Sequence, residues 1–229
     1  MATLLFPLSQ TLYLRDPQRS ALGRKILAVS VQLIDKLGFE QFTFKKLAEA
    51  IGSTEASVYR YFENKHRLLL YLIDWYWMGM GYQFDIVTQN LTDPHQRLDA
   101  CLHVLLSGKI DDIYSDELDT GALKRLVMAE FEKTYLTKQV DRDHKDGAFL
   151  PYKAVCNKLA KILKEINPHF RYPLTLISTV LLSANHQLFY AEHLPSLTDI
   201  RFNPEKHHQQ LENFLRILIL KTIEPRSNA

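Results

Sequence analysis

The spacing of apolar residues constrains this chain more than any other feature of its sequence. Between residues 20 and 37 apolar residues recur every three or four positions, which places them on one face of an α-helix. Gly38 follows, where helices commonly end in a left-handed residue. Similar stretches recur to about residue 223, and no run of alternating apolar and polar residues predicts a strand. We therefore expect an all-α chain of about nine helices.

The composition is that of an ordinary globular protein, with 46% hydrophobic and 24% charged residues. No stretch approaches the ~18 consecutive apolar residues of a membrane span. Arg15 is the first basic residue, so the apolar N-terminal residues lack the charged segment of a secretory signal. Cys101 and Cys156 lack metal-ligand spacing. We expect a cytoplasmic protein with no disulfide, no bound metal, no cofactor and no membrane partner.

Positive charge is concentrated at the N-terminal end. Residues 1–70 hold ten Lys and Arg against six Asp and Glu, whereas the remainder holds 18 against 20. A basic head on a slightly acidic body favours a DNA-binding module, although a chance fluctuation explains the charge alone equally well.

Two short helices are predicted within this basic part, over 44–51 and 55–62. Thr43 and Thr54 are suitable N-cap residues, and Gly52 lies in the turn between the helices. With the longer helix before them, they form a helix-turn-helix arrangement. The second helix of such an arrangement projects from the protein to enter a major groove.

The geometry of the second short helix can be worked out from its sequence. At about 100° per residue, Val58 and Phe62 fall on one buried face. Arg60 points the opposite way and can bind guanine through two hydrogen bonds. The alternative is a short surface helix with no DNA-binding role. The residues around Arg60 are small or carry hydroxyl groups that can reach phosphate: Ala56, Ser57, Tyr59 and Tyr61.

Asn64 is predicted to cap the next helix, which begins with the residues Lys65, His66 and Arg67. The helix dipole disfavours positive charge in a first turn, so this basic turn suggests a function. Together with the free backbone N–H groups it could hold a DNA phosphate. Alternatively, the long side chains simply reach water.

Residues 39–65, FEQFTFKKLAEAIGSTEASVYRYFENK, resemble the DNA-binding head of the TetR family of transcriptional regulators. Members combine Gly-Phe after the first helix, a Thr/Ser-x-x-x-(Ile/Leu)-Ala second helix, and a recognition segment close to Ser-x-(Gly/Ala)-(Ser/Thr)-(Leu/Val)-Tyr-x-(His/Tyr)-Phe-x-(Ser/Asn)-Lys. The strong resemblance covers about residues 20–70, and the rest matches only in helical order. The matching positions are Gly38, Phe39, Thr43, Leu47, Ala48, Gly52, Thr54, Ala56, Ser57, Val58, Tyr59, Tyr61, Phe62, Asn64 and Lys65.

The resemblance implies that Thr43 and Lys65 contact phosphate and that Arg60 reads a base. Two positions depart from the family pattern. Glu55 stands where many members have Lys or Arg, and it repels phosphate unless it accepts a hydrogen bond from cytosine N4. Lys46 replaces a common acidic residue, so the operator sequence of a relative cannot be transferred. The predicted DNA-binding residues are Thr43, Lys45, Lys46, Thr54, Glu55, Ala56, Ser57, Tyr59, Arg60, Tyr61 and Lys65.

Two long C-terminal stretches, about 173–193 and 204–223, are apolar on more than one face. A helix that is apolar all round must be buried on all sides, either within one subunit or against a partner. The TetR resemblance implies that these helices form a four-helix bundle in a two-fold homodimer, whose two heads bind a palindromic double-stranded DNA operator. The predicted interface residues are Leu174, Ile177, Leu181, Leu188, Leu211, Phe214, Leu215 and Leu218.

The resemblance alone implies an unknown small-molecule ligand that releases the dimer from DNA. Aromatic, Met and His residues of the body could line an apolar pocket with a few polar anchors, although core packing is the commoner role of such residues. The candidates are Trp75, Met78, Tyr82, His103, Met128, Phe131, His186 and Tyr190.

The expected organisation is an N-terminal arm over 1–19, a three-helix head over 20–66, and a helical dimerisation and ligand-binding body over 67–229. We find no Gly-rich phosphate loop, metal cluster or nucleophile motif, so we expect no catalytic residues and no enzyme. The alternative to a ligand-released repressor is a DNA-bound dimer that acts mainly by recruiting a protein partner.

Overall fold

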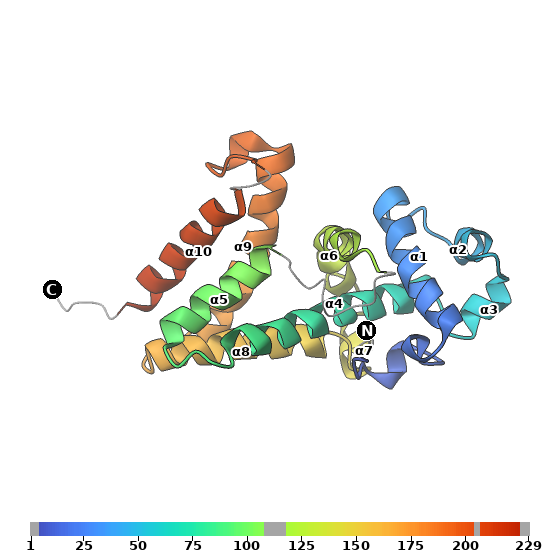
Figure 1. Ribbon diagram of the computed structural model, residues 1–229, viewed down its shortest axis with the longest axis horizontal. Helices are drawn as coiled ribbons and strands as arrows, with labels where there is room; N and C mark the ends of the chain where they lie inside the picture. Colours follow the sequence, from blue (N-terminus) through green and yellow to red (C-terminus); the bar gives the residue numbers. More distant parts are fainter. Residues whose placement is uncertain (1–4, 108–117, 204–206, 225–229) are drawn as a thin grey trace. The chain divides into compact units, whose positions relative to one another are not determined.

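The regular structure of the chain is helical throughout the described residues, which are 5–107, 118–203 and 207–224 of a computed structural model (Figure 1). The all-α prediction is therefore confirmed, with ten α-helices in these ranges in place of about nine. The α-helices are α1 (Ala21–Leu37), α2 (Phe44–Ile51), α3 (Glu55–Tyr59), α4 (Lys65–Thr88), α5 (Pro94–Ser107), α6 (Thr120–Tyr135), α7 (Val140–Lys145), α8 (Leu150–Ile166), α9 (Pro173–His193) and α10 (His207–Ile223).

Local side-chain caps fix the starts of the helices in the head. Thr43 and Thr54 each accept a hydrogen bond of 3.2 Å from the backbone N–H three residues later. Asn64 does the same for α4 at 2.9 Å. Gly38 and Gly52 end α1 and α2 with φ of 77° and 67°, a region that favours glycine. The sequence predicted the three caps and the helix end at Gly38, and it placed Gly52 in the turn, because each depends on neighbours within a few residues.

Two helices differ from the prediction, and one predicted helix start cannot be compared. Helix α3 ends at Tyr59 in place of residue 62, because the chain turns there and both Tyr61 and Phe62 donate backbone hydrogen bonds to the Val58 carbonyl. Helix α7 occupies part of 141–147, a stretch predicted to be a loop. The predicted start of the last helix at residue 204 lies outside the described residues.

The chain divides into two compact units. The first comprises Met1–Gly79 with Ile110–Tyr152, and the second comprises Met80–Lys109 with Lys153–Ala229. Helices α4 and α8 therefore each contribute residues to both units. The division into arm, head and body is one by function, and it stays a prediction.

The first unit is built around α1, which packs against α2 and α6. The N-terminal arm is part of this unit, because Leu12 is fully buried. Gln18 closes the arm into a loop by bonding both the N–H and the carbonyl of Phe6, each at 2.9 Å. The arm reaches α1 at Gly23, where a Cβ atom would lie 2.3 Å from the carbonyl oxygen of Pro17. Only glycine permits this approach.

The second unit is built from the packing of α10 against both α5 and α9. Cys101 and Cys156 are buried thiols in this unit, and burial raises the pKa of Cys101 to about 12. No helix among the described residues is long and apolar enough to cross a membrane.

Candidate DNA-binding site

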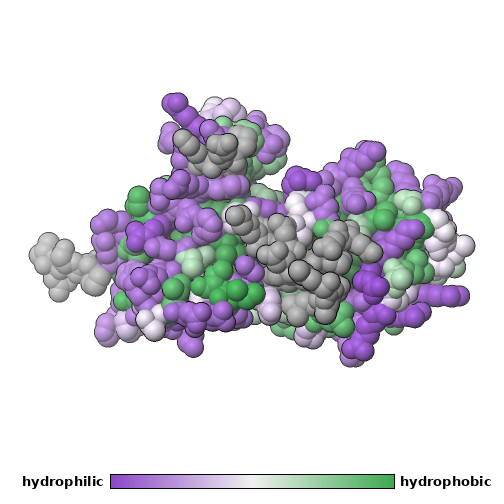
Figure 2. All heavy atoms as spheres, viewed as in Figure 1, coloured by the Kyte–Doolittle hydropathy of each residue, from purple (hydrophilic) through white to green (hydrophobic). Residues whose placement is uncertain are grey.

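Helix α3 and the turn after it, residues 55–62, are called the recognition segment. This segment has an inner and an outer face. Val58 and Phe62 are fully buried beneath the segment. Ala56, Tyr59 and Arg60 are exposed on the outside. Figure 1 shows α2 and α3 beside α1, and Figure 2 shows hydrophilic residues projecting at the edges of this head, on the right of the view. The segment therefore presents an outer face that a DNA groove can receive.

Tyr59 is held on this outer face by a packing contact with a core residue. Its ring packs edge-on against Phe44 of α2, with the ring centroids 5.0 Å apart, while 48% of the residue remains exposed. The contact holds the ring and leaves the side chain accessible to a phosphate oxygen.

Two exposed cations lie free on the head. The guanidinium of Arg60 and the ammonium of Lys45 make no hydrogen bond or ion pair with any part of the chain that the structure describes. Glu55 is also exposed, at the first position of α3. A phosphate or a base edge can therefore bind either cation without breaking an existing contact.

The polar residues around the two N-caps lie on the same head. Thr43 and Lys46 are exposed at the start of α2, and the Lys46 ammonium donates to the carbonyl of Gln41 at 2.8 Å. Thr54 and Ser57 share a side-chain hydrogen bond of 3.0 Å at the start of α3. Lys46 therefore has a local partner that Lys45 does not.

The predicted role of Tyr61 is corrected. Its residue is only 2% exposed, and its hydroxyl is hydrogen-bonded at 2.8 Å to the hydroxyl of Ser20, the N-cap of α1. Tyr61 therefore joins the recognition segment to the first helix of the head, and its hydroxyl is not offered to DNA.

Lys65, predicted to contact phosphate, has partners within the chain. Its ammonium donates to the carbonyl oxygens of Phe39, Glu40 and Phe42 at 3.1, 3.2 and 3.3 Å. It also lies 4.7 Å from the centroid of the Phe39 ring. The ammonium thus holds the loop after α1, and its contact with a phosphate stays a prediction.

The basic first turn of α4 has acidic partners far along the chain. Arg67 is nearly buried and bonds Asp143 at 3.4 Å and also Asp146. His66 approaches Asp143 with its Nε2 at 2.8 Å. The turn is therefore an internal ion-pair cluster and not a free phosphate site. The prediction missed both aspartates, and the only signal for them was a cationic turn where the helix dipole opposes it.

The predicted dimer residues separate into buried and accessible ones. Four are buried within the second unit, so the prediction is corrected for Ile177, Leu181, Leu211 and Leu215. The other four are exposed or partly exposed: Leu174, Phe214, Leu188 and Leu218. Phe189 and Ile217, which the prediction omitted, are also exposed.

The predicted ligand residues do not form one cluster within one unit. His103 was a candidate polar anchor of a pocket, but its side chain is 62% exposed and paired with Glu212 at 3.2 Å. Phe131 lies in an aromatic core with its ring 4.7 Å from that of Tyr152. Four candidates belong to the first unit and four to the second: Trp75, Met78, Met128 and Phe131, then Tyr82, His103, His186 and Tyr190.

Comparison with known proteins identifies the head. Residues 26–72 match the sequence profile of the bacterial regulatory proteins of the tetR family. A comparison with characterised protein sequences found no significant match. The part of the chain that the structure describes contains no group of three His, Cys, Asp or Glu side chains that could hold a metal ion.

Solved structures share the fold over most of the chain. A putative TetR-family transcriptional regulator from Syntrophomonas wolfei is 12% identical, with a TM-score of 0.64 over 86% of this chain and 94% of that one. The fatty acid degradation regulator FadR from Bacillus halodurans is 15% identical, with a TM-score of 0.62 over 86% and 95%. AibR, solved with isovaleryl coenzyme A and operator DNA, is 16% identical, with a TM-score of 0.55 over 85% and 96%.

Loss of the hydroxyl group should lower protein stability at Tyr61 and DNA affinity at Tyr59. Tyr61→Phe should lower the free energy of unfolding by about 0.5–1.5 kcal/mol, because it removes the hydrogen bond to Ser20. Tyr59→Phe should leave stability unchanged and weaken DNA binding. Urea unfolding and DNA titration of both variants test this, and equal loss of stability in the two would contradict the assignment.

Proposed function

We propose that this member of the TetR family is a homodimeric transcriptional repressor that binds a palindromic operator and is released from it by a small molecule. The observation that carries the proposal is the outer face of α3, where Tyr59 and Arg60 are exposed above the buried Val58. Such a face fits a major groove, and a free guanidinium can bind guanine O6 and N7 together. We further propose that the chain has no enzymatic activity and acts in the cytoplasm.

Exposed apolar residues on α9 and α10 support the dimer. Leu174 and Phe189 of α9 are 50% and 51% exposed, and Phe214 and Ile217 of α10 are 47% and 60% exposed. Apolar side chains of this size on two neighbouring helices favour cover by a second copy. Two heads in one dimer bind one palindromic site, and their affinities then combine.

A small-molecule ligand is favoured by the likeness of the fold to ligand-bound regulators. AibR was solved with isovaleryl coenzyme A, and FadR is a regulator of fatty acid degradation. We infer that a ligand of this chain acts by binding better to a form of the dimer whose heads do not fit the operator. The alternative is a dimer that recruits a protein partner while it remains on DNA.

Substitution of Arg60 and of Lys45 should separate base reading from phosphate binding. Arg60→Ala should reduce discrimination at one base pair of each half-site by about 1–3 kcal/mol, because a base contact is lost. Lys45→Ala should weaken binding to all sequences alike, because a phosphate contact carries no sequence information. Binding of both variants to the operator and to single-base variants of it measures the two effects. Unchanged sequence preference in Arg60→Ala would refute the base-reading role.

A charge placed on the exposed apolar face should dissociate the dimer. Phe214→Glu should give a monomer in analytical ultracentrifugation and lower operator affinity by about 10²- to 10⁴-fold, because the two heads no longer bind as one. Asn213→Glu adds the same charge at the adjacent exposed residue and serves as the matched control. A dimeric Phe214→Glu protein would count against this interface.

Ligand release can be tested on the preformed complex with DNA. Addition of short-chain and long-chain acyl coenzyme A should dissociate the operator complex if the ligand resembles those of the similar regulators. Coenzyme A alone is the control for the shared nucleotide part. A complex that persists with every acyl chain length would favour the protein-recruiting alternative.

A further inference from the structure

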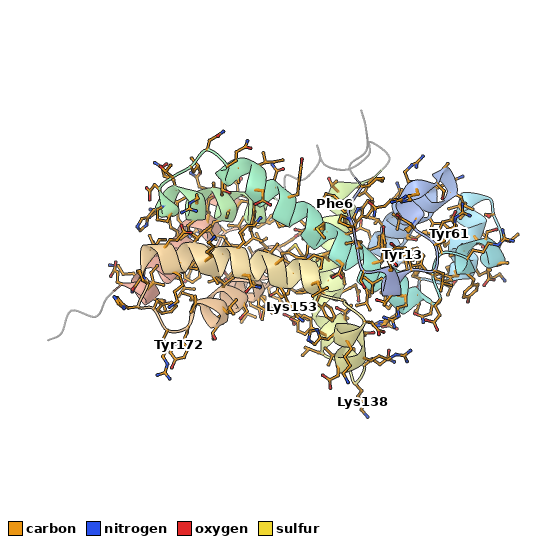
Figure 3. All side chains as sticks on the ribbon, turned by 90° about the horizontal axis from the view of Figure 1, so that it is seen from below. Phe6, Tyr13, Tyr61, Lys138, Lys153 and Tyr172 are labelled. Carbon is orange, nitrogen blue, oxygen red and sulfur yellow. The ribbon has the colours of Figure 1, made fainter. Side chains whose placement is uncertain are left out.

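The N-terminal arm runs directly along the end of the recognition segment. The backbone N–H of Leu14 donates to the carbonyl of Tyr61 at 2.8 Å. Beside it the Tyr13 ring packs edge-on against Tyr71, with centroids 5.9 Å apart. Figure 3 labels Tyr13 and Tyr61 in this part of the head. Residues 13–15 are therefore fixed against the segment that carries Arg60.

Arg15 lies on this fixed part of the arm with its charge unneutralised. Its guanidinium carbon is 5.4 Å from the centroid of the Tyr61 ring, and the residue is exposed. It forms no ion pair or hydrogen bond within the described residues. The neighbouring Asp16 is engaged elsewhere, since it bonds Arg19 at 3.0 Å and the backbone N–H of Gln18 at 2.9 Å.

We propose that Arg15 is a DNA contact that binds a backbone phosphate next to the site of Arg60. A guanidinium stacked on an aromatic ring keeps its N–H groups free at its edge, where they can bond two phosphate oxygens. Tyr61 is held by Ser20 and follows Arg60 in sequence, so the ring places Arg15 and Arg60 on neighbouring parts of one surface. The arm therefore extends the DNA-binding surface beyond residues 26–72.

This inference rests on the proposed function, because it assigns a further residue to the same DNA complex. A phosphate contact releases counterions, so each one contributes about 0.9 to the slope of log affinity against log salt concentration. The measured quantity is therefore the salt dependence of operator binding and not affinity at one salt concentration.

The experiment compares Arg15→Ala, Arg15→Lys and Lys138→Ala with the unchanged protein. Lys138 is an exposed lysine of the same unit, and Figure 3 shows it projecting beyond α6 and α7, away from the head. Arg15→Ala should lower the salt slope by about 0.9 for each bound protomer. Arg15→Lys keeps the charge and should keep most of the slope, whereas Lys138→Ala should leave it unchanged.

Thermal unfolding and phosphate ethylation of the operator complete the test. Arg15→Ala should unfold at an unchanged temperature and should lose interference at one ethylated phosphate in each half-site. A wild-type slope in Arg15→Ala, or an equal fall in Lys138→Ala, would overturn the inference while the proposed regulator stands. Failure of the unchanged protein to bind DNA at low salt would overturn both. If Arg15→Ala unfolded early, Arg15→Gln takes its place, because it keeps a long polar side chain without the charge. A fall of about 0.9 in its salt slope would support the contact, and an unchanged slope would refute it.

Discussion

The candidate DNA-binding surface of this chain depends on the burial of the inner side of the recognition segment. Helix α3 has only five residues, and isolated helices shorter than about 12–15 residues are marginal in water. Its form therefore depends on Val58 and Phe62 beneath it and on the hydrogen bond between Tyr61 and Ser20. Because these contacts fix the inner side, they also decide which side chains point outward.

The sequence predicted the parts of the head that depend on near neighbours. The caps at Thr43, Thr54 and Asn64 each join residues three apart, so their spacing can be read directly. The intrachain partners of Tyr61 and Lys65 were not predicted, because they lie 41 and 23 to 26 residues away. A tyrosine hydroxyl or a lysine ammonium fits DNA and a distant carbonyl or hydroxyl equally well, and a motif does not distinguish the two.

The C-terminal helices show a different limit of prediction. Their apolar residues on several faces predicted burial on all sides, and the structure covers only one part of each helix within the second unit. On α10, Leu211 and Leu215 are buried while Phe214 and Ile217 remain exposed. The spacing of apolar residues predicts which faces of a helix are buried from water. It does not say whether the cover comes from the same chain or from another copy.

The arm also bears on the order in which the protein folds. The Ser9 hydroxyl donates to the carbonyl of Asp146 at 2.8 Å, and these residues lie 137 positions apart. Synthesis at about 5–20 residues per second separates their emergence by roughly 7–27 s. Helix α2 packs against both α1 and α3, so these contacts of the head can form within that interval. The contact of the arm with Asp146 must wait until the residues after α7 have been made. Synthesis therefore makes this contact of the arm possible only after the helices of the head are complete.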